Sequence, residues 1–204
     1  MTSDFVSFVK LNSDTKILVL FGEIHGTKEV PALLTNLFSE MIKTESFNVC
    51  FEFSSNFQKK FNSFFNTGDI SLIEKLFEDN SDGRLSDHYL TLMRKIYDLN
   101  SNSKNSISVF CVDVADNFSS ENFQNDREEI IAKNILQINS QKTFAILGNI
   151  HASIKPLDSL NGIMPTGFYL KEELNDSCVS IQLVPKSLDI NPFKPYSELF
   201  FVYK

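Results

Sequence analysis

The chain has 204 residues, which is enough for one domain with a sizeable hydrophobic core. Apolar residues make up 42% of the sequence and include 20 phenylalanines, so the material for such a core is present. A formal net charge of −7 and the lack of a basic stripe argue against a nucleic-acid partner.

The cysteines and the N-terminal residues bear on the compartment. Cys50, Cys111 and Cys178 lie in apolar runs, and their odd number and wide spacing fit neither a disulfide framework nor a zinc site. Buried free thiols in a reducing compartment are therefore expected. Residues 1–14 contain no apolar run after a basic start, and no stretch approaches the ~20 apolar residues that span a bilayer. These features predict a cytoplasmic protein with no membrane partner.

The first third of the chain alternates between strand and helix patterns. Lys16–Phe21 is a continuous apolar run, typical of a strand covered on both faces in a parallel sheet. Lys28–Lys43 repeats apolar residues at three- and four-residue intervals, which predicts a helix with Thr27 as its N-cap. Asn48–Phe53 is the next strand, and this order implies a right-handed crossover between parallel strands.

A polar, phenylalanine-rich insertion follows from residue 54 to residue 106. Its periodicity predicts two or three helical stretches, at Asn56–Phe65, Ile70–Phe77 and Leu85–Leu99. The run Asn100–Asn105 is a loop by composition.

The rest of the chain completes an α/β pattern. The sequence predicts two strands around a long helix, then a short helix and two closing strands: Ile107–Val112, Glu121–Ile138, Thr143–Leu147, Tyr169–Leu174, Cys178–Val184 and Glu198–Tyr203. The two closing strands could pair antiparallel. The expected architecture is a single α/β domain over residues 1–204, with the 54–106 insertion built into it.

Four of the predicted strands end beside residues capable of acid–base chemistry. The first runs into Glu23 and His25, the second carries Glu52, the third runs into Asp113 and the fourth runs into His151. Ligands of open α/β sheets bind outside the carboxyl ends of the strands. The pattern therefore predicts an active site at this edge of the sheet.

The two strand-end histidines are the strongest candidates. His25 and His151 each follow a strand-ending glycine, and two histidines at equivalent positions favour function over a structural role. A neutral imidazole can ligate a metal, act as a general base or donate to a developing oxyanion. The third histidine, His88, has no strand end nearby and is expected to be a surface or core residue.

Several carboxylates accompany these histidines. Glu23 lies two residues before His25, so both side chains can face one pocket; alternatively, Glu23 only orients a neighbour. Glu52 lies within an apolar strand, where an unpaired carboxylate is costly, and this favours function. Asp113 could cap the next segment or join the site. Glu29 in the first helical turn is interpreted as favouring the helix dipole.

Arg127 gives an independent argument for a polar site. It falls on the apolar stripe of the predicted helix Glu121–Ile138, and Asn134 lies on the same stripe. A guanidinium on the sheet-facing side needs a carboxylate, and Glu23 and Glu52 are the candidate partners.

Several common catalytic and nucleotide-binding motifs are missing. The sequence has no GxSxG elbow, no GxxxxGK[ST] loop, no GxGxxG after the first strand and no HExxH helix. Serine hydrolases of the elbow type, phosphate-loop enzymes and zincin proteases therefore have no motif support.

Four short blocks, in order and on the expected elements, resemble a known superfamily. They are GEIHGTKE at 22–29, FEF at 51–53, DREEIIAKNI at 126–135 and GNIHA at 148–152. Together they are similar to the erythromycin esterase-like group, which includes ChaN-type haem-binding proteins and Tiki metalloproteases. The resemblance covers most of the chain from the first strand through the fourth, and the GEIHG spacing is closer to the ChaN and Tiki form.

The resemblance implies a mainly parallel β-sheet flanked by helices on both faces. It makes His25 a catalytic base or metal ligand and Glu23 the acid that precedes it. It makes Glu52 the glutamate that activates water, Arg127 the pocket arginine and His151 the histidine of the last motif.

We therefore expect a hydrolase that acts on an ester or amide bond of a small-molecule or peptide substrate. Glu52, helped by His25, would deprotonate or position water, and His151 would stabilise the oxyanion or protonate the leaving group. Arg127 would keep a glutamate charged or bind an anion. A divalent metal (Mn, Zn, Fe or Co) held by His25, His151 and either Glu23 or Glu52 is compatible with this set. The alternative is a haem- or metal-binding protein without turnover that uses the same histidines.

Overall fold

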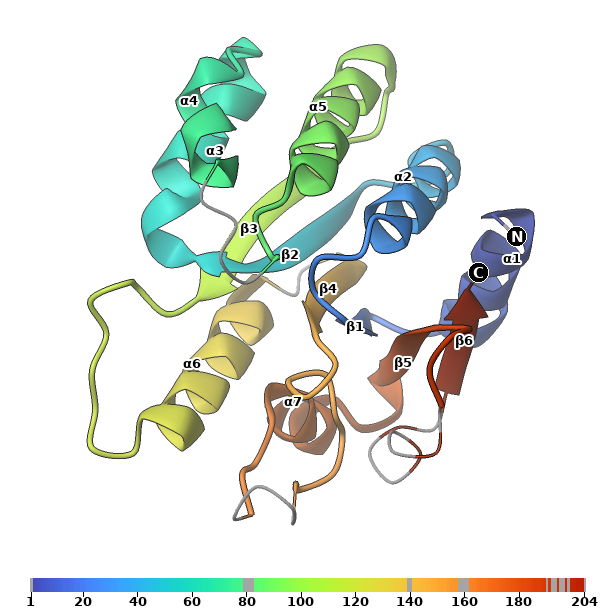
Figure 1. Ribbon diagram of the computed structural model, residues 1–204. Helices are drawn as coiled ribbons and strands as arrows, with labels where there is room; N and C mark the ends of the chain where they lie inside the picture. The colour runs from blue at the N-terminus through green and yellow to red at the C-terminus, as the bar shows by residue number, and fades with distance from the viewer. Residues whose placement is uncertain are drawn as a thin grey trace.

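A single parallel β-sheet organises the chain (Figure 1). The computed structural model describes residues 2–78, 83–138, 141–157, 162–189, 191, 194, 197 and 199–203. Within these residues six strands lie in the order β3-β2-β4-β1-β5-β6, and every neighbouring pair is parallel. Their bounds are β1 Leu18–Glu23, β2 Phe47–Ser54, β3 Ile107–Asp113, β4 Thr143–Gly148, β5 Cys178–Pro185 and β6 Leu199–Tyr203.

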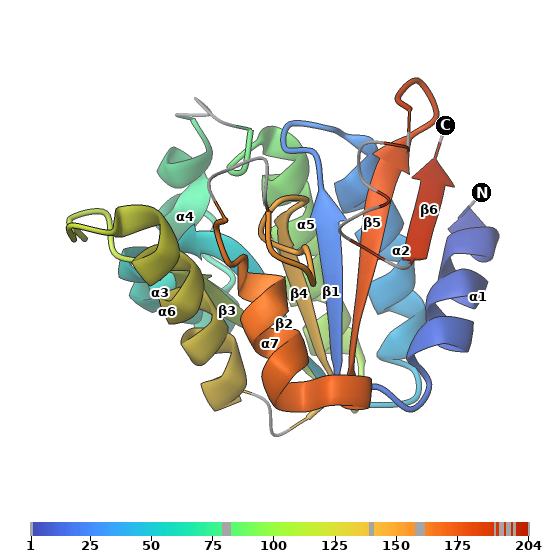
Figure 2. The same ribbon diagram turned by 90° about the horizontal axis from the view of Figure 1, so that it is seen from below.

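Helices cover both faces of the sheet, as expected (Figure 2). One face carries α1 (Thr2–Ser13), α2 (Glu29–Met41) and α5 (Asp87–Asn102), and the other carries α6 (Phe123–Ile138) and α7 (Thr166–Leu174). The predicted helix 28–43 is α2, and the predicted 121–138 and 169–174 are α6 and α7. The predicted cap Thr27 is wrong, because Lys28 is the N-cap residue and already has helical φ and ψ angles of −78° and −21°.

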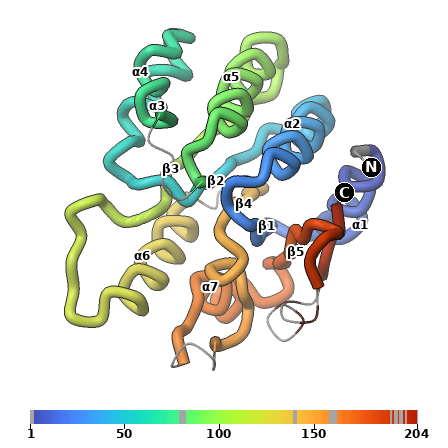
Figure 3. Tube along the Cα trace, viewed as in Figure 1, coloured from blue at the N-terminus to red at the C-terminus, as the bar shows by residue number. Residues whose placement is uncertain are grey.

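The C-terminal strands correct one expectation. β6 lies parallel to β5, with Ile181 opposite Leu199, so the antiparallel alternative was wrong. Parallel neighbours need a crossover connection of about a dozen residues or more, and residues 186–198 provide that length. Helix α1, for which the sequence analysis predicted no element, packs beside β6, where the rings of Phe5 and Phe201 lie 4.8 Å apart (Figure 3).

The 54–106 insertion consists of short helices followed by one long helix. They are the 3-10 turn η1 (Ser55–Phe57), α3 (Gln58–Thr67), α4 (Ser71–Glu74), the 3-10 turn η2 (Lys75–Phe77) and α5. Gln58 fixes this segment to the edge of the sheet: its amide donates to Val109 O at 3.0 Å and accepts from Cys111 N at 2.7 Å. The insertion therefore lies beside the carboxyl ends of β2 and β3.

Two hydrophobic clusters, one on each face of the sheet, form the core. In the larger, the fully buried ring of Phe144 contacts those of Phe21, Phe38 and Phe47 at centroid distances of 5.3 to 6.1 Å. All three cysteines are buried and free, as predicted. Among the described residues no helix is both long and apolar enough to cross a membrane.

Replacing Phe144 with alanine should lower the free energy of unfolding by about 3–5 kcal/mol, because it leaves a cavity among three aromatic rings. Chemical denaturation followed by circular dichroism measures this loss. The control is Phe123→Ala, since the Phe123 side chain is 39% exposed and belongs to neither core cluster. That change should cost less than about 1 kcal/mol, and equal losses in the two variants would contradict the assignment of the core.

Candidate active site

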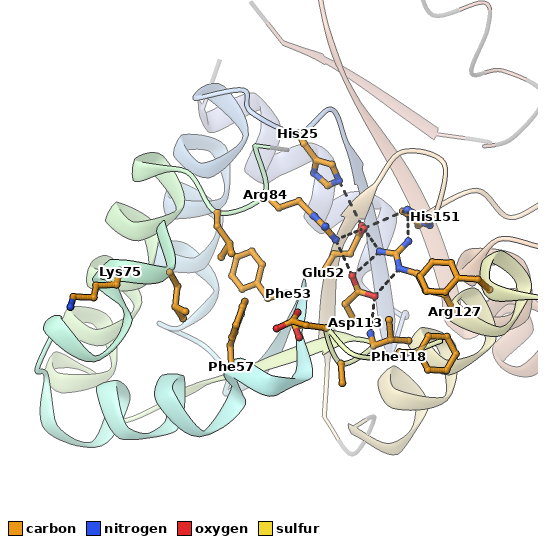
Figure 4. Close-up of a pocket in the computed structure, with 17 residues that line it drawn as sticks. His25, Glu52, Phe53, Phe57, Lys75, Arg84, Asp113, Phe118, Arg127 and His151 are labelled. Atoms are coloured by element: carbon orange, nitrogen blue, oxygen red, sulfur yellow. Dashed lines mark hydrogen bonds and ion pairs between the residues drawn. The ribbon is translucent and has the colours of Figure 1, made fainter. Parts of the chain in front are cut away.

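The strand-end residues singled out in the sequence meet at one edge of the sheet (Figure 4). Because β3, β2, β4 and β1 are successive neighbours, Asp113, Glu52, His151 and His25 converge although they are far apart in sequence. They border a cleft of about 820 Å³, which also includes Arg127 from α6. Glu23 lies behind His25 and contacts its ring.

Glu52 lies at the centre and is only 4% exposed. Its Oε1 accepts hydrogen bonds from Arg127 Nη2 at 2.7 Å and from Arg84 Nη1 at 3.3 Å. Its Oε2 accepts from the backbone N–H of Gly148 at 2.7 Å. Both carboxylate oxygens are therefore held by donors.

These donors and the histidines decide the ionisation of Glu52. Burial alone would raise its pKa, but the charges of His151, Arg127 and His25 and the Gly148 N–H act against burial. Their combined effect lowers the pKa of Glu52 to about 2. Glu52 is thus an anion over the whole physiological pH range.

Asp113 belongs to the site and also caps the chain that follows it, so both alternatives for this residue are realised. Arg127 Nε donates to its Oδ1 at 2.8 Å and Arg127 Nη2 to its Oδ2 at 2.7 Å, a bidentate pair. The same Oδ1 accepts from Val114 N at 2.7 Å. Arg84 Nη1 adds a bond to Oδ2 at 2.9 Å, so two guanidinium groups share Asp113 and Glu52.

His25 forms the first carboxylate–imidazole pair. Its Nδ1 lies 2.9 Å from Glu23 Oε1, and the Tyr89 hydroxyl donates to Glu23 Oε2. Burial raises the pKa of Glu23, and the hydrogen bonds from His25 and Tyr89 only partly oppose this effect. His25 Nε2 faces the cleft, 3.9 Å from Glu52 Oε2.

His151 forms the second pair, with Glu128. Its Nδ1 lies 2.5 Å from Glu128 Oε1, and the other oxygen of Glu128 accepts from Thr166 N and Thr166 Oγ1, both at 2.8 Å. Burial would lower the pKa of His151, but the carboxylates of Glu52 and Glu128 raise it above its ordinary value. Nε2 lies 3.1 Å from Arg127 Nη1 and 3.5 Å from Glu52 Oε1. When the ring is neutral Nε2 accepts from Arg127, and when it is protonated Nε2 faces the carboxylate.

Gly148 lies next to both imidazole rings and, having no side chain, leaves the space between them open. A Cβ atom at this position would lie 3.0 Å from His25 Nε2, 3.2 Å from His151 Cδ2 and 3.5 Å from Glu52 Oε2. Both rings and the central carboxylate therefore border one point, which any larger residue would fill. The point itself is one bond length from Gly148 Cα, so a water molecule or a reacting carbonyl group would lie in the cleft in front of it, which both His25 and His151 line.

The expected metal ligands are close together but do not form a metal site. Among the described residues, no group of three or more His, Cys, Asp or Glu side chains is arranged to hold a metal ion. The Nδ1 atom of His25 is already hydrogen-bonded to Glu23. The Glu52 carboxylate already accepts hydrogen bonds from the guanidiniums of Arg84 and Arg127. The Arg127 guanidinium also lies against Nε2 of His151. A cation bound by His25, His151, Glu23 and Glu52 would lie next to that positive charge, so the residues present do not fit a divalent metal.

Sequence reasoning missed four residues of the site. Glu128 directly follows Arg127, and the available signal in the sequence was its spacing of three, four and seven residues from Ile131, Ala132 and Ile135, with which it shares the buried side of α6. Thr166, Arg84 and Tyr89 lie in segments where no strand-end argument applies. His88, by contrast, is exposed and outside the site, as expected. Asn134 is structural, since its amide donates to Val112 O at 2.9 Å.

A contact between two glycines explains how Arg84 reaches the site. A Cβ on Gly83 would lie 2.6 Å from Gly26 N, so the two backbones touch. Both glycines have positive φ angles, +83° and +82°, which side-chain-bearing residues rarely adopt. The contact holds the segment that leads into Arg84 against the loop that carries His25.

Comparison with known proteins supports the fold. A scan of protein-family models and a search of curated protein sequences find no match to this chain. Among solved structures, a succinoglycan biosynthesis protein is 13% identical, with a TM-score of 0.72 over 88% of this chain and 69% of its own. A mutant of erythromycin esterase EreC is 9% identical, with a TM-score of 0.70 over 88% of this chain and 72% of its own.

ChaN of Campylobacter jejuni, solved with cofacially bound haem, is 14% identical, with a TM-score of 0.54 over 99% of this chain and 91% of its own. The chain therefore shares its fold with an erythromycin esterase and with ChaN, two of the kinds of protein that the sequence blocks resemble. At these identities the likeness concerns the fold alone.

The lowered pKa of Glu52 predicts how stability depends on pH. The contribution of this carboxylate is fully present above pH 4.5 and is lost as the pH falls towards 2. Glu52→Gln should therefore unfold with a shallower dependence on pH in this window, and should lose on the order of a few kcal/mol at neutral pH. Urea denaturation at a series of pH values measures both effects. An unchanged pH dependence in Glu52→Gln would contradict the assigned ion pairs.

Proposed function

We propose that this protein is a hydrolase that cleaves an ester or amide bond by general acid–base catalysis. The observation that carries the proposal is the pair of carboxylate-held imidazoles, His25 with Glu23 and His151 with Glu128, which border the same point beside Gly148. One ring can accept a proton while the other donates one, which hydrolysis of a carbonyl compound requires.

His25 is suited to be the base. With Nδ1–H donated to Glu23, its Nε2 carries the lone pair and faces the cleft. Water then adds to the substrate carbonyl carbon while its proton passes to Nε2, and the carbonyl electrons move onto oxygen. Tyr89 and Glu23 hold the ring in this tautomer.

His151 is suited to be the acid, because Glu52 and Glu128 favour its protonated form. When the tetrahedral intermediate collapses, the bond to the leaving group breaks and His151 supplies the proton that the leaving atom needs. The guanidiniums of Arg127 and Arg84 place positive charge beside the developing oxyanion, which stabilises it electrostatically.

Glu52 acts in this proposal as an anchor rather than as the base that the sequence analysis favoured. Its two oxygens are held by Arg127, Arg84 and the Gly148 N–H, and a carboxylate with a pKa of about 2 is a weak base. It fixes the guanidiniums, and when His151 is protonated it pairs with that ring.

Replacing either catalytic histidine tests the proposal. Ester hydrolysis should fall by roughly 10²–10⁴-fold in His25→Ala and in His151→Ala, since each change removes one proton transfer. His88→Ala is the matched control, because His88 is exposed on α5. The assay measures kcat/KM on a panel of p-nitrophenyl esters and peptide p-nitroanilides. Equal activity in all three variants would overturn the proposed site.

The pH profile separates the roles of His25, Glu52 and His151. The basic limb of kcat/KM should lie above 6.5, because neighbouring carboxylates raise the pKa of His151, and Glu128→Gln should move it to lower pH. The acidic limb should lie far above pH 2. An acidic limb near pH 2 would instead identify Glu52 as the general base.

Haem binding without turnover is the second candidate. The ChaN structure has haem bound, and here His25 Nε2 faces a cleft with aromatic side chains on its walls. His25 would be the iron ligand. Titration with hemin should then give a saturable Soret band that His25→Ala loses and His88→Ala retains. A featureless titration of the wild type would dismiss this candidate.

A further inference from the structure

The cleft that ends at the two imidazoles has apolar walls on both sides. We infer that these walls bind an aromatic or branched aliphatic acyl group of a neutral small-molecule ester or amide. The inference rests on the proposed hydrolase function and specifies its substrate class. Figure 4 shows Phe57 and Phe118 on opposite sides of the cleft, with the charged groups between them.

The first wall belongs to the 54–106 insertion. Phe57, Leu76 and Leu85 line the cleft and are partly buried, and they pack from behind against the larger hydrophobic cluster. Their positions are therefore fixed by the core before any ligand binds. A preformed apolar wall costs little ordering entropy when a ligand contacts it.

The second wall belongs to the connection between β3 and α6. The rings of Phe118 and Phe123 lie 5.6 Å apart, and both residues line the cleft. Neither belongs to the two clusters that form the described core, and Phe123 is 39% exposed. Two aromatic rings that pack on each other at a cleft mouth gain hydrophobic contact when a ligand covers them.

Size and charge indicate a neutral small molecule. A volume of about 820 Å³ lies in the range of sites for drug-sized ligands. At the inner end, the guanidiniums of Arg84 and Arg127 are paired with Glu52 and Asp113. The lining also contains one more cation, Lys75, and one more anion, Asp116, so the formal charges around the cleft balance. An acyl group between the two walls contacts their apolar side chains, while its carbonyl lies beside Gly148.

A series of p-nitrophenyl esters that differ only in the acyl group tests the inference by turnover. In the wild type, kcat/KM should rise at least about tenfold from acetate to phenylacetate. Phe118→Ala and Phe123→Ala should remove most of this rise, mainly by raising the KM for phenylacetate. Leu11→Ala, which alters an 83% exposed residue of α1, is the control and should behave like the wild type.

Binding can also be measured without turnover, because the chain contains no tryptophan. Phe123→Trp introduces a single tryptophan into the second wall, and excitation at 295 nm avoids the five tyrosines. Titration with 4-phenyl-2-butanone, a ketone that cannot be hydrolysed, should change its emission saturably, and acetone at the same concentrations should not. The double variant Phe118→Ala/Phe123→Trp should bind 4-phenyl-2-butanone roughly tenfold more weakly than Phe123→Trp alone.

The two experiments fail independently. Saturable binding of the ketone without hydrolysis of any ester would support the apolar site and refute the hydrolase. Hydrolysis of esters with equal kcat/KM for acetate and phenylacetate, together with no fluorescence response, would overturn the inference and leave the hydrolase standing. Cleavage confined to peptides extended on both sides of the bond would also overturn the small-molecule assignment.

Discussion

The site depends on the ion pairs that Arg127 makes with Glu52 and Asp113. Arg127 comes from α6, Glu52 from β2 and Asp113 from β3. Their ion pairs therefore connect two neighbouring strands to α6, on the face of the sheet opposite α5. A buried carboxylate without a partner would be costly, and this cost is why the three groups hold one another in place. The His151 ring is then oriented between Arg127 on one side and Glu128 on the other.

The same constraint explains why much of the site was predictable from sequence. A charged residue in an apolar strand or on an apolar helical stripe must have a partner, which singled out Glu52 and Arg127. Parallel strands deliver their carboxyl ends to one edge, which brought His25 and His151 together. The apolar runs of β1, β2 and β4 located these strands to within about two residues for the same reason, since their side chains are almost all buried on both faces of the sheet.

What could not be predicted lies where long-range packing decides the structure. The position of Arg84 depends on a backbone contact between Gly83 and Gly26. A glycine has no side chain, so the sequence around it does not indicate which distant residue it contacts. Tyr89 resembles any other apolar residue of an amphipathic helix until Glu23 is seen beside its hydroxyl. β6 pairs parallel with β5, and the composition of a strand does not encode its direction.

The insertion contributes to the site in two separate ways. Its first part, with Phe57 and Leu76, lines the cleft, and no described hydrogen bond or ion pair joins these two side chains to Glu52, Arg127 or His151. Its second part carries Arg84 and Tyr89 and is held to the His25 loop by the two glycines. The first stretch therefore meets the cleft through apolar side chains, and the second contributes the apolar Leu85 together with the charged Arg84. The first stretch is constrained by packing, because Phe61 and Phe64 are buried in the larger hydrophobic cluster and Gln58 bonds to β3. The second is constrained by register, because any change in the spacing between Gly83 and Tyr89 would misalign both Arg84 and Tyr89.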